Sequence, residues 1–198
     1  MTQEKKLEQL NKVGEYLYQK DLHSYQTIFH EPTKTCTEAK EVYDSYKKTL
    51  MQRGIDDYAL VKSILYTDKT GSKYFLCLTL SDKKIDSKDV KKALNLNCKL
   101  PVATDNQVVD VLDVVPGNVS IFSLINDLDS KITGVYVDPD IYKYEVCAVI
   151  PNCNEVTMFF DTNIIDTVIK SHQIKFYDTL FSPLFEDGNE VKVYKKVM

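Results

Sequence analysis

Two apolar runs separated by a short turn constrain the fold of this 198-residue chain more than any other feature of its sequence. Residues 59–66 and 73–80 are rich in aliphatic and aromatic side chains, and the segment between them contains DKTGS. Apolar runs of this length that flank a turn with glycine are typical of a β-hairpin. The sequence therefore predicts two antiparallel strands at 59–66 and 73–80.

Short helices and strands are predicted on both sides of this hairpin. Apolar residues spaced by three and four predict an amphipathic helix at the N-terminus. Mixed short elements of this kind favour an α/β or α+β domain with a mixed sheet. We expect a helix at 1–22, one domain at 23–183 and a polar tail or linker at 184–198. Within the domain we expect helices near 37–50, 86–96, 105–114 and 161–173, and further strands near 25–29, 120–126, 131–138, 144–150, 155–160 and 174–181.

The charge of the chain narrows the classes of ligand. Its net charge is −4, and Arg53 is the single arginine among 25 basic residues. An acidic chain of this kind is not expected to bind DNA through a broad basic surface. Bidentate arginine clamps on phosphate are nearly excluded, so contacts with RNA would have to use lysine ammonium groups.

The cysteines and the N-terminus indicate a cytoplasmic protein without a metal. The five cysteines include no C-x-x-C pair, so neither a disulfide framework nor a zinc ribbon is supported. No histidine and cysteine cluster has ligand spacing, and we expect no cofactor. The charged N-terminus lacks an apolar signal core, and no apolar run is long enough to span a membrane, so no membrane partner is expected.

Four segments carry spaced polar and small residues that together resemble a known family. They are FHEPTKTCTEA (29–39), LVKSIL (60–65), PGNVSIFSLIND (116–127) and IPNCNEVT (150–157). Their order and spacing resemble the YbaK/ProX family of aminoacyl-tRNA editing domains over roughly residues 25–181. The resemblance implies a mixed, partly barrel-like β-sheet flanked by short helices.

The resemblance also implies roles for particular residues. Lys62 falls at the pocket lysine of the family, and Gly117 falls where the backbone approaches the ester, so both are expected to be catalytic. The sequence departs from the family pattern at Ile150, where the family has histidine, and at Ser63, where asparagine is common. The expected substrate-binding residues are His30, Thr35, Ser63, Val119, Ser120, Phe122, Asn126, Ile150, Pro151 and Asn154.

Several of these residues have ordinary structural interpretations as well. A lysine inside a strand, such as Lys62, most often faces solvent. His30 fits a strand end and Asn154 fits a turn. The functional interpretation is that the Lys62 ammonium supplies a compact charge with three donors, while backbone N–H groups near Gly117 stabilise oxyanion charge. Ser120 has no neighbouring base and is expected to be a wall residue or a water contact.

The resemblance implies an enzyme that hydrolyses mischarged tRNA. A synthetase gains only about 1–3 kcal/mol of discrimination from one methylene, so smaller amino acids become attached to proline tRNA. We expect alanine on tRNA(Pro) as the first substrate and cysteine on the same tRNA as the second. The chain is either free-standing or the editing domain of a longer prolyl-tRNA synthetase, which makes the synthetase a partner in trans or in cis. The alternative, kept open by Ile150 and Ser63, is a non-catalytic module that docks on tRNA or on a synthetase.

Overall fold

The computed structural model describes residues 2–33, 35–85, 87–97 and 99–172, together with the backbone of three short strands after them. For Gln3 and Cys36 it describes the backbone alone. The helices are α1 (Gln3–Gln19), α2 (Cys36–Gln52), α3 (Ser87–Ala93), α4 (Asp105–Leu112) and α5 (Ile164–Ser171), with 3-10 helices η1 (Ile121–Asn126) and η2 (Pro139–Lys143). The strands are β1 (Tyr25–Phe29), β2 (Ala59–Thr67), β3 (Tyr74–Leu80), β4 (Ile132–Val137), β5 (Val146–Val149), β6 (Val156–Asp161), β7 (Lys175–Tyr177), β8 (Phe181–Leu184) and β9 (Val193–Lys196).

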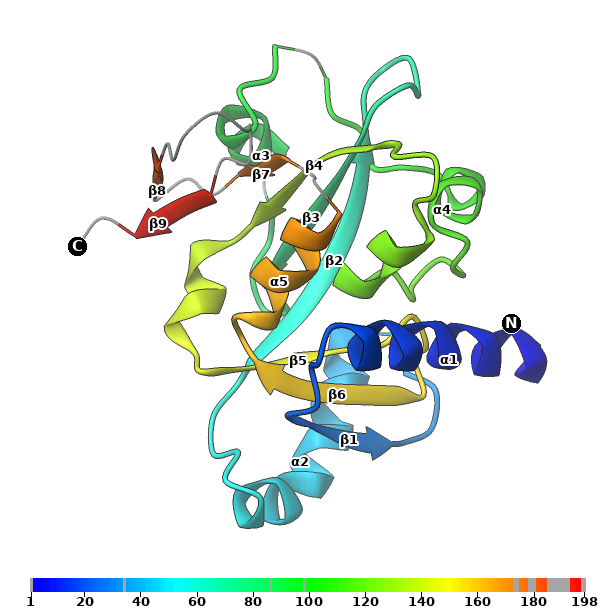
Figure 1. The fold of residues 1–198 in the computed structure, drawn as a ribbon, viewed down its shortest axis with the longest axis vertical. Helices are drawn as coiled ribbons and strands as arrows, with labels where there is room; N and C mark the ends of the chain where they lie inside the picture. Colours follow the sequence, from blue (N-terminus) through cyan, green and yellow to red (C-terminus); the bar gives the residue numbers. More distant parts are fainter. Residues whose placement is uncertain are drawn as a thin grey trace.

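One mixed sheet forms the centre of the molecule (Figure 1). Its seven strands are ordered β1-β6-β5-β2-β3-β4-β7, while β8 and β9 form a separate pair. The predicted hairpin is confirmed, because β2 and β3 are antiparallel with Val61 opposite Leu80 and Thr67 opposite Tyr74. Parallel pairs join β2 to β5 and β3 to β4, so the sheet is mixed as expected. It is not closed into a barrel, since β1 and β7 lie at opposite ends of the strand order.

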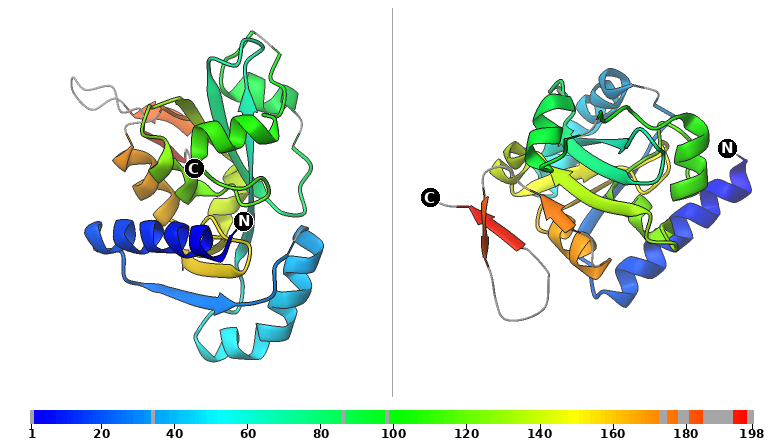
Figure 2. Two further views of the ribbon diagram at one scale, coloured as in Figure 1. Left: turned by 90° about the vertical axis from the view of Figure 1, so that its right-hand side faces the viewer. Right: turned by 90° about the horizontal axis from the view of Figure 1, so that it is seen from above.

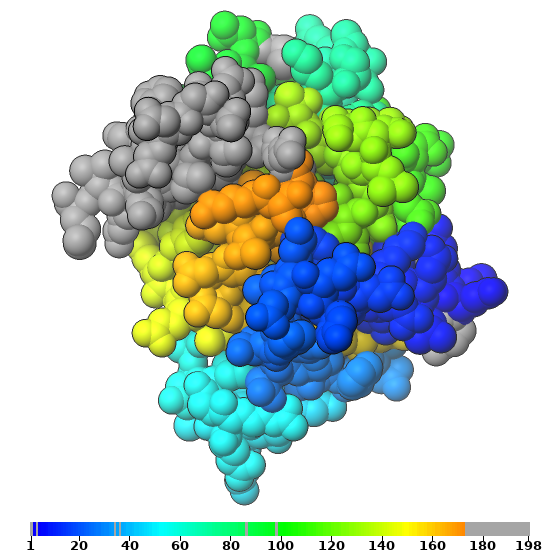
Figure 3. All heavy atoms as spheres, in the orientation of Figure 1, coloured from blue at the N-terminus to red at the C-terminus, as the bar shows by residue number. Residues whose placement is uncertain are grey.

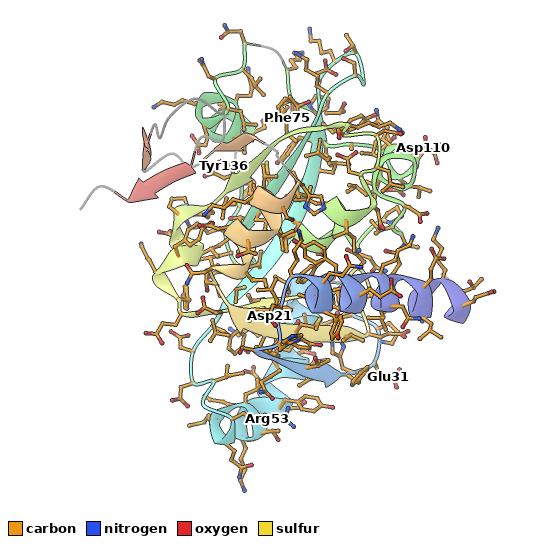
Figure 4. All side chains as sticks on the ribbon, viewed as in Figure 1. Asp21, Glu31, Arg53, Phe75, Asp110 and Tyr136 are labelled. Carbon is orange, nitrogen blue, oxygen red and sulfur yellow. The ribbon has the colours of Figure 1, made fainter. Side chains whose placement is uncertain are left out.

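Helices cover both faces of this sheet (Figure 2). The largest apolar core joins α1, α4, η1 and α5 to one face, and its buried members include Val13 and Leu17 of α1. On the other face α2 packs against β1, β5 and β6, and α3 packs against β2, β3 and β4. Figure 4 marks Arg53 at the end of α2 and, at the opposite end of the molecule, Phe75 of β3 and Tyr136 of β4. The sheet is therefore the middle layer of three.

The helices predicted from apolar spacing are confirmed within a few residues, but one predicted strand is wrong. Where a strand was expected at 120–126, Ile121–Asn126 form the 3-10 helix η1 and Ser120 is its N-cap. The Ser120 hydroxyl accepts a hydrogen bond from the Phe122 N–H, and the Ser123 hydroxyl accepts one from the Ser120 N–H. This reciprocal cap satisfies the first turn of a helix. Four consecutive residues, Ile121–Leu124, are buried, so their apolar run does not distinguish a strand from a buried helical turn.

Two predictions concern the C-terminal part of the chain. The strand expected near 174–181 is present as β7 at 175–177, and residues 178–180 lie outside the described residues. The polar tail expected at 184–198 also lies outside them, apart from the backbone of β9 and the last residue of β8.

Helix α4 ends at Leu112, two residues before the end of the helix predicted at 105–114, and Asp113 forms its C-cap. Asp113 adopts a left-handed conformation with φ 50° and forms ion pairs with Lys5 and Lys12 of α1. Figure 3 shows α1 and the α4 segment on the same face of the molecule. Burial raises the pKa of Asp113, but the hydrogen bond and charge of Lys5 and the charge of Lys12 outweigh burial, so this pKa lies below its ordinary value.

We expect the contact between Asp113 and α1 to weaken in acid. Because the native pKa is depressed, its stabilisation is present above the ordinary carboxyl pKa of 3.8 and is lost as pH falls through the native pKa. Asp113→Asn, which suits the left-handed conformation, should lose less than about 1 kcal/mol at pH 7 because the pair is partly exposed. Thermal melts of both proteins from roughly pH 6 to pH 2 should show a shallower decline for the variant. Parallel declines would show that Asp113 does not contribute to acid sensitivity.

Candidate functional site

The sheet divides where β2 leaves β5. Their parallel pairing covers only two positions, Ala59 with Cys147 and Leu60 with Ala148. Beyond Leu60, β2 continues along β3 whereas β5 stays with β6. In the described chain, the next partner of the β2 edge that faces β5 is Val102, which forms an isolated bridge with Tyr66. The two strands therefore diverge, and a pocket opens between them.

This pocket has a volume of about 220 Å³, smaller than the roughly 300–1,000 Å³ of sites for drug-sized ligands. Four chain segments form it: the loop from β1 with the first turns of α2, the start of β2, the loop from α4 to η1, and the end of β5 with the loop to β6. Much of its wall is aliphatic, so it suits a small ligand with an apolar part. Its lining residues are Thr33, Thr35, Ala39, Tyr43, Leu60, Val61, Lys62, Ser63, Gly117, Val119, Ser120, Val149, Ile150 and Asn154.

The pocket brings together eight of the twelve residues singled out in the sequence. They are Thr35, Lys62, Ser63, Gly117, Val119, Ser120, Ile150 and Asn154. These residues span more than a hundred positions of the sequence, from the end of the β1 loop to the β5–β6 loop. The clustering joins all four motif segments in one place.

Lys62 is the positively charged residue among those that line the described pocket. Its Nζ donates to the Ser81 carbonyl at 3.0 Å and also to the Lys83 carbonyl, both in the segment that follows β3. An ammonium has three donors, so one remains for a ligand. Within the described residues no carboxylate forms an ion pair with Lys62, and the acceptors that hold it are neutral. Lys62 therefore lines the pocket without a carboxylate partner among the described residues.

Ser63 presents a polar backbone to the same space. The Ser81 N–H donates to the Leu60 carbonyl on the β3 side, and the Ala103 N–H donates to the Leu65 carbonyl on the opposite side. Because backbone groups alternate sides along a strand, those of Ser63 point away from β3 toward the divergence of β2 and β5. The described chain shows no hydrogen-bond partner for them or for the Ser63 hydroxyl. An unpaired strand edge of this kind can bind a ligand main chain or carbonyl.

Gly117 closes the pocket from the opposite side. Its φ is +88°, a conformation that residues with a Cβ rarely adopt. A Cβ added there would meet no atom within 4 Å, so the space in front of Gly117 is open. The glycine is required by backbone conformation, and the backbone at this position is accessible.

Four of the predicted substrate-binding residues do not line the pocket. Phe122 is 0 % exposed and packs near Phe160, with ring centroids 5.4 Å apart. Asn126 donates through Nδ2 to the Leu112 carbonyl at 2.8 Å and to Gln9 of α1. Pro151 is buried beside the lining residue Ile150. His30 lies behind the wall.

His30 is joined to the pocket by a chain of hydrogen bonds. Its Nδ1 lies 2.8 Å from the Glu31 carbonyl, which can only accept, so Nδ1 carries the proton. Nε2 shares a hydrogen bond of 2.9 Å with the Thr157 hydroxyl, which in turn shares one of 2.9 Å with the Tyr43 phenol. Tyr43 lines the pocket. Glu31, labelled in Figure 4, lies in the segment that leaves β1. His30 thus orients a wall residue.

Tyr43, Thr33 and Leu60 are pocket residues that the sequence interpretation did not include. Tyr43 is 2 % exposed and its place in the apolar stripe of α2 resembles that of any core aromatic. Thr33 exchanges two hydrogen bonds with Asn154: its N–H donates to the Asn154 carbonyl at 3.1 Å, and Asn154 Nδ2 donates to its carbonyl at 2.9 Å. Asn154 thereby holds the β1–α2 loop against the β5–β6 loop.

The described pocket wall contains no imidazole, carboxylate or thiol. Buried cysteines lie elsewhere: burial raises the pKa of Cys147 to about 12 and also raises the pKa values of Cys77 and Cys153. These thiols are protonated at neutral pH and are unsuited to nucleophilic attack. In the part of the chain that the structure describes, no group of three His, Cys, Asp or Glu residues could hold a metal ion. The wall supplies hydroxyls, one ammonium, the carboxamide of Asn154 and backbone groups.

A larger depression of about 340 Å³ adjoins the pocket and shares Tyr43 and Leu60 with it. Its charged lining residues are Lys40, Lys47, Asp44, Asp56, Asp57 and Asp82. Carboxylates outnumber ammonium groups there, which disfavours a phosphate ligand. The smaller pocket has Lys62 and no carboxylate in its lining, so it is the better site for an anionic group.

A model of the aminoacyl-tRNA editing domain family matches residues 30–167. The chain belongs to this family. The matched range contains every segment of the pocket wall, and α1 precedes it. Among the described residues no helix is long and apolar enough to cross a membrane.

Two solved structures share the fold of this editing domain. The crystal structure of hypothetical protein APE2540 is 17 % identical, with a TM-score of 0.60, and the alignment covers 84 % of this chain and 97 % of that one. A "putative trans-editing enzyme for prolyl tRNA synthetase" is 12 % identical, with a TM-score of 0.59 and coverage of 86 % and 95 %. At these identities the likeness establishes the fold.

Proposed function

We propose that the protein is an aminoacyl-tRNA deacylase that hydrolyses mischarged tRNA(Pro), with alanine as the preferred amino acid. The observation that carries the proposal is the clustering of eight motif residues around one small pocket at the divergence of β2 and β5. Family membership supports editing, and the named function of the second structural neighbour motivates the choice of proline tRNA. The resemblance to the YbaK/ProX branch motivates the same choice.

The proposed reaction is hydrolysis of the ester between the amino acid and the terminal ribose. A water oxygen bonds to the carbonyl carbon, and the resulting oxyanion accepts hydrogen bonds from backbone N–H groups at Gly117 or Ser63. Donors already held in place stabilise this charge without reorganisation. The bond from carbon to the ribose oxygen then breaks, and the ribose oxygen takes up the proton that the water loses. Because the described wall has no base, the neighbouring ribose hydroxyl relays this proton.

The shape of the pocket supports a small amino acid. Val61, Val119, Val149 and Ile150 contribute aliphatic wall, and Ile150 takes the position where the family pattern has histidine. An aliphatic wall suits the methyl group of alanine, whereas a thiol gains no hydrogen bond from it. Size exclusion of proline then separates the mischarged from the correct product. Cysteine is the second substrate to test.

Single-turnover hydrolysis of Ala-tRNA(Pro), Cys-tRNA(Pro) and Pro-tRNA(Pro) tests the proposal directly. We expect free alanine to be released fastest and proline to be retained on its tRNA. Release of cysteine faster than alanine would reverse the assigned preference. A protein that binds the three tRNAs but releases no amino acid would be a non-catalytic docking module.

Hydrolysis should not require a metal ion. The proposed chemistry uses an ammonium and backbone donors, and the described residues offer no ligand cluster. We expect the rate to be unchanged after dialysis against a chelator, measured on the same Ala-tRNA(Pro) preparation. A loss of activity that zinc restores and magnesium does not would show that a metal takes part. Magnesium is kept constant in all reactions because it also supports the fold of tRNA.

A further inference from the structure

A glutamine of the N-terminal helix is buried at the back of the candidate pocket. Gln9 of α1 is 0 % exposed, and it lies outside the range matched by the family model. Its neighbours on the buried face of α1, Val13 and Leu17, are apolar as expected for a core-facing helix. A fully buried amide among such residues requires partners for all of its polar atoms.

The Gln9 amide connects two segments that carry pocket residues. Its Oε1 accepts from Asn126 Nδ2 at 2.9 Å and from Asn152 Nδ2 at 3.2 Å. Its Nε2 donates to the Asp113 carbonyl at 3.1 Å. Asp113 begins the α4–η1 loop, Asn126 ends η1, and Asn152 lies in the β5–β6 loop. One side chain therefore binds both ends of the segment 113–126 and also the β5–β6 loop.

Asn152 transmits this contact to the pocket wall. Its Oδ1 accepts from the Ser120 hydroxyl at 3.0 Å and from the Ser123 hydroxyl at 2.8 Å. Ser120 lines the pocket, and so do the residues two positions before and after Asn152, Ile150 and Asn154. Asn152 itself has φ +59°, a conformation that asparagine tolerates better than most residues. Its amide fixes the loop in this conformation.

We propose that Gln9 is a positioning residue of the editing pocket, so that α1 helps to set the geometry of the site. The inference rests on the proposed function. Without the Gln9 oxygen, Asn126 still has the Leu112 carbonyl as an acceptor, but Asn152 Nδ2 has no other partner in the described chain. The Asn152 side chain then turns to reach water, and Ser120 loses its acceptor. Both walls of the pocket shift.

The test replaces Gln9 by methionine, which has nearly the same shape and no amide. Gln9→Met should lower kcat for Ala-tRNA(Pro) by roughly ten- to a hundredfold, because small displacements of aligned groups have effects of this size. KM should stay nearly constant, since Gln9 is fully buried and does not contact the tRNA. The matched control is Gln19→Met, the same change at an exposed position of the same helix, which should behave like the wild type.

Leu17→Ala separates positioning from stability. Leu17 is 1 % exposed in the same helix and makes no polar contact with the loops, so its truncation weakens the packing of α1 alone. If Leu17→Ala lowers kcat as much as Gln9→Met at equal melting temperature, Gln9 acts through helix stability and the proposal is overturned. If Gln9→Met does not fold, Gln9→Asn, which keeps the amide on a shorter stem, takes its place with the same expected result.

Hydrogen exchange distinguishes a failure of this inference from a failure of the proposed function. Gln9→Met should speed amide exchange in residues 118–126 and 150–155 relative to Gln19→Met, whatever the substrate is. A wild-type protein that hydrolyses no aminoacyl-tRNA overturns the proposed function, and exchange alone then decides whether Gln9 orders the loops. Unchanged exchange and unchanged kcat in a folded Gln9→Met protein overturn the inference.

Discussion

Lys62→Ala should slow hydrolysis of Ala-tRNA(Pro) by about tenfold to more than a hundredfold. A hydrogen bond to a charged group is worth roughly 1.5–3 kcal/mol, and each 1.36 kcal/mol corresponds to a factor of ten in rate. Lys62 lines the pocket, and its Nζ donates to the Ser81 and Lys83 carbonyls, which leaves one of its three donors unused in the described chain. Single-turnover measurements with enzyme in excess isolate this step from tRNA release.

Two further variants make the Lys62 result specific. Lys62→Met keeps most of the apolar stem and removes the charge, so it should be as slow as Lys62→Ala while packing is preserved. Lys73→Ala removes an exposed lysine next to the start of β3 and should be close to wild type. Both Lys62 variants release the Ser81 and Lys83 carbonyls to water, so we expect only a small decrease in melting temperature. A folded Lys62→Met protein with the wild-type rate would mean that Lys62 is a solvent-facing strand residue.

The arrangement of the site was only partly predictable from the sequence. The hairpin and the helices follow local patterns of apolar spacing, and these elements were predicted from those patterns. The divergence of β2 from β5 depends on where their parallel pairing stops. This pairing joins positions 59–60 to positions 147–148, and no local sequence pattern encodes a contact between segments so far apart. The pocket at this divergence therefore emerges only when the strands are placed in three dimensions.

Residues behind the pocket wall were missed for a related reason. Gln9 is a polar residue whose side-chain partners beyond α1 all lie more than a hundred positions away in the sequence, and Asn152 is one of them. A glutamine in a charged amphipathic helix is ordinarily exposed, and nothing in the surrounding residues marks this one as buried. His30 and Asn126 were singled out as substrate contacts, but the structure uses both to orient or to anchor other groups. Motif position identifies the neighbourhood of a site more readily than the role of each side chain.

Substitution of Phe122 should lower the stability of the fold, whereas substitution of Lys62 should lower the rate of hydrolysis. The Phe122 ring is fully buried in the main core, close to Phe160. Phe122→Ala should lower the free energy of unfolding by about 3–5 kcal/mol, a large share of the roughly 5–15 kcal/mol typical of a folded protein. In a chain of this size that corresponds to a fall of roughly 6–20 °C in melting temperature. Urea unfolding followed by circular dichroism gives the same quantity from the midpoint and slope.

The control for Phe122 is Leu128→Ala, two residues beyond the end of η1. Leu128 is 90 % exposed, so its truncation removes little buried surface and should leave the melting temperature nearly unchanged. Phe122→Leu retains much of the buried volume and should lose less stability than Phe122→Ala, with hydrolysis by the folded protein close to wild type. The opposite result, Phe122→Ala with wild-type stability and slow hydrolysis, would restore the substrate contact expected from the sequence motif. Lys62 and Phe122 would then belong to the same wall, and the β2–β5 pocket would have to open further than the structure shows.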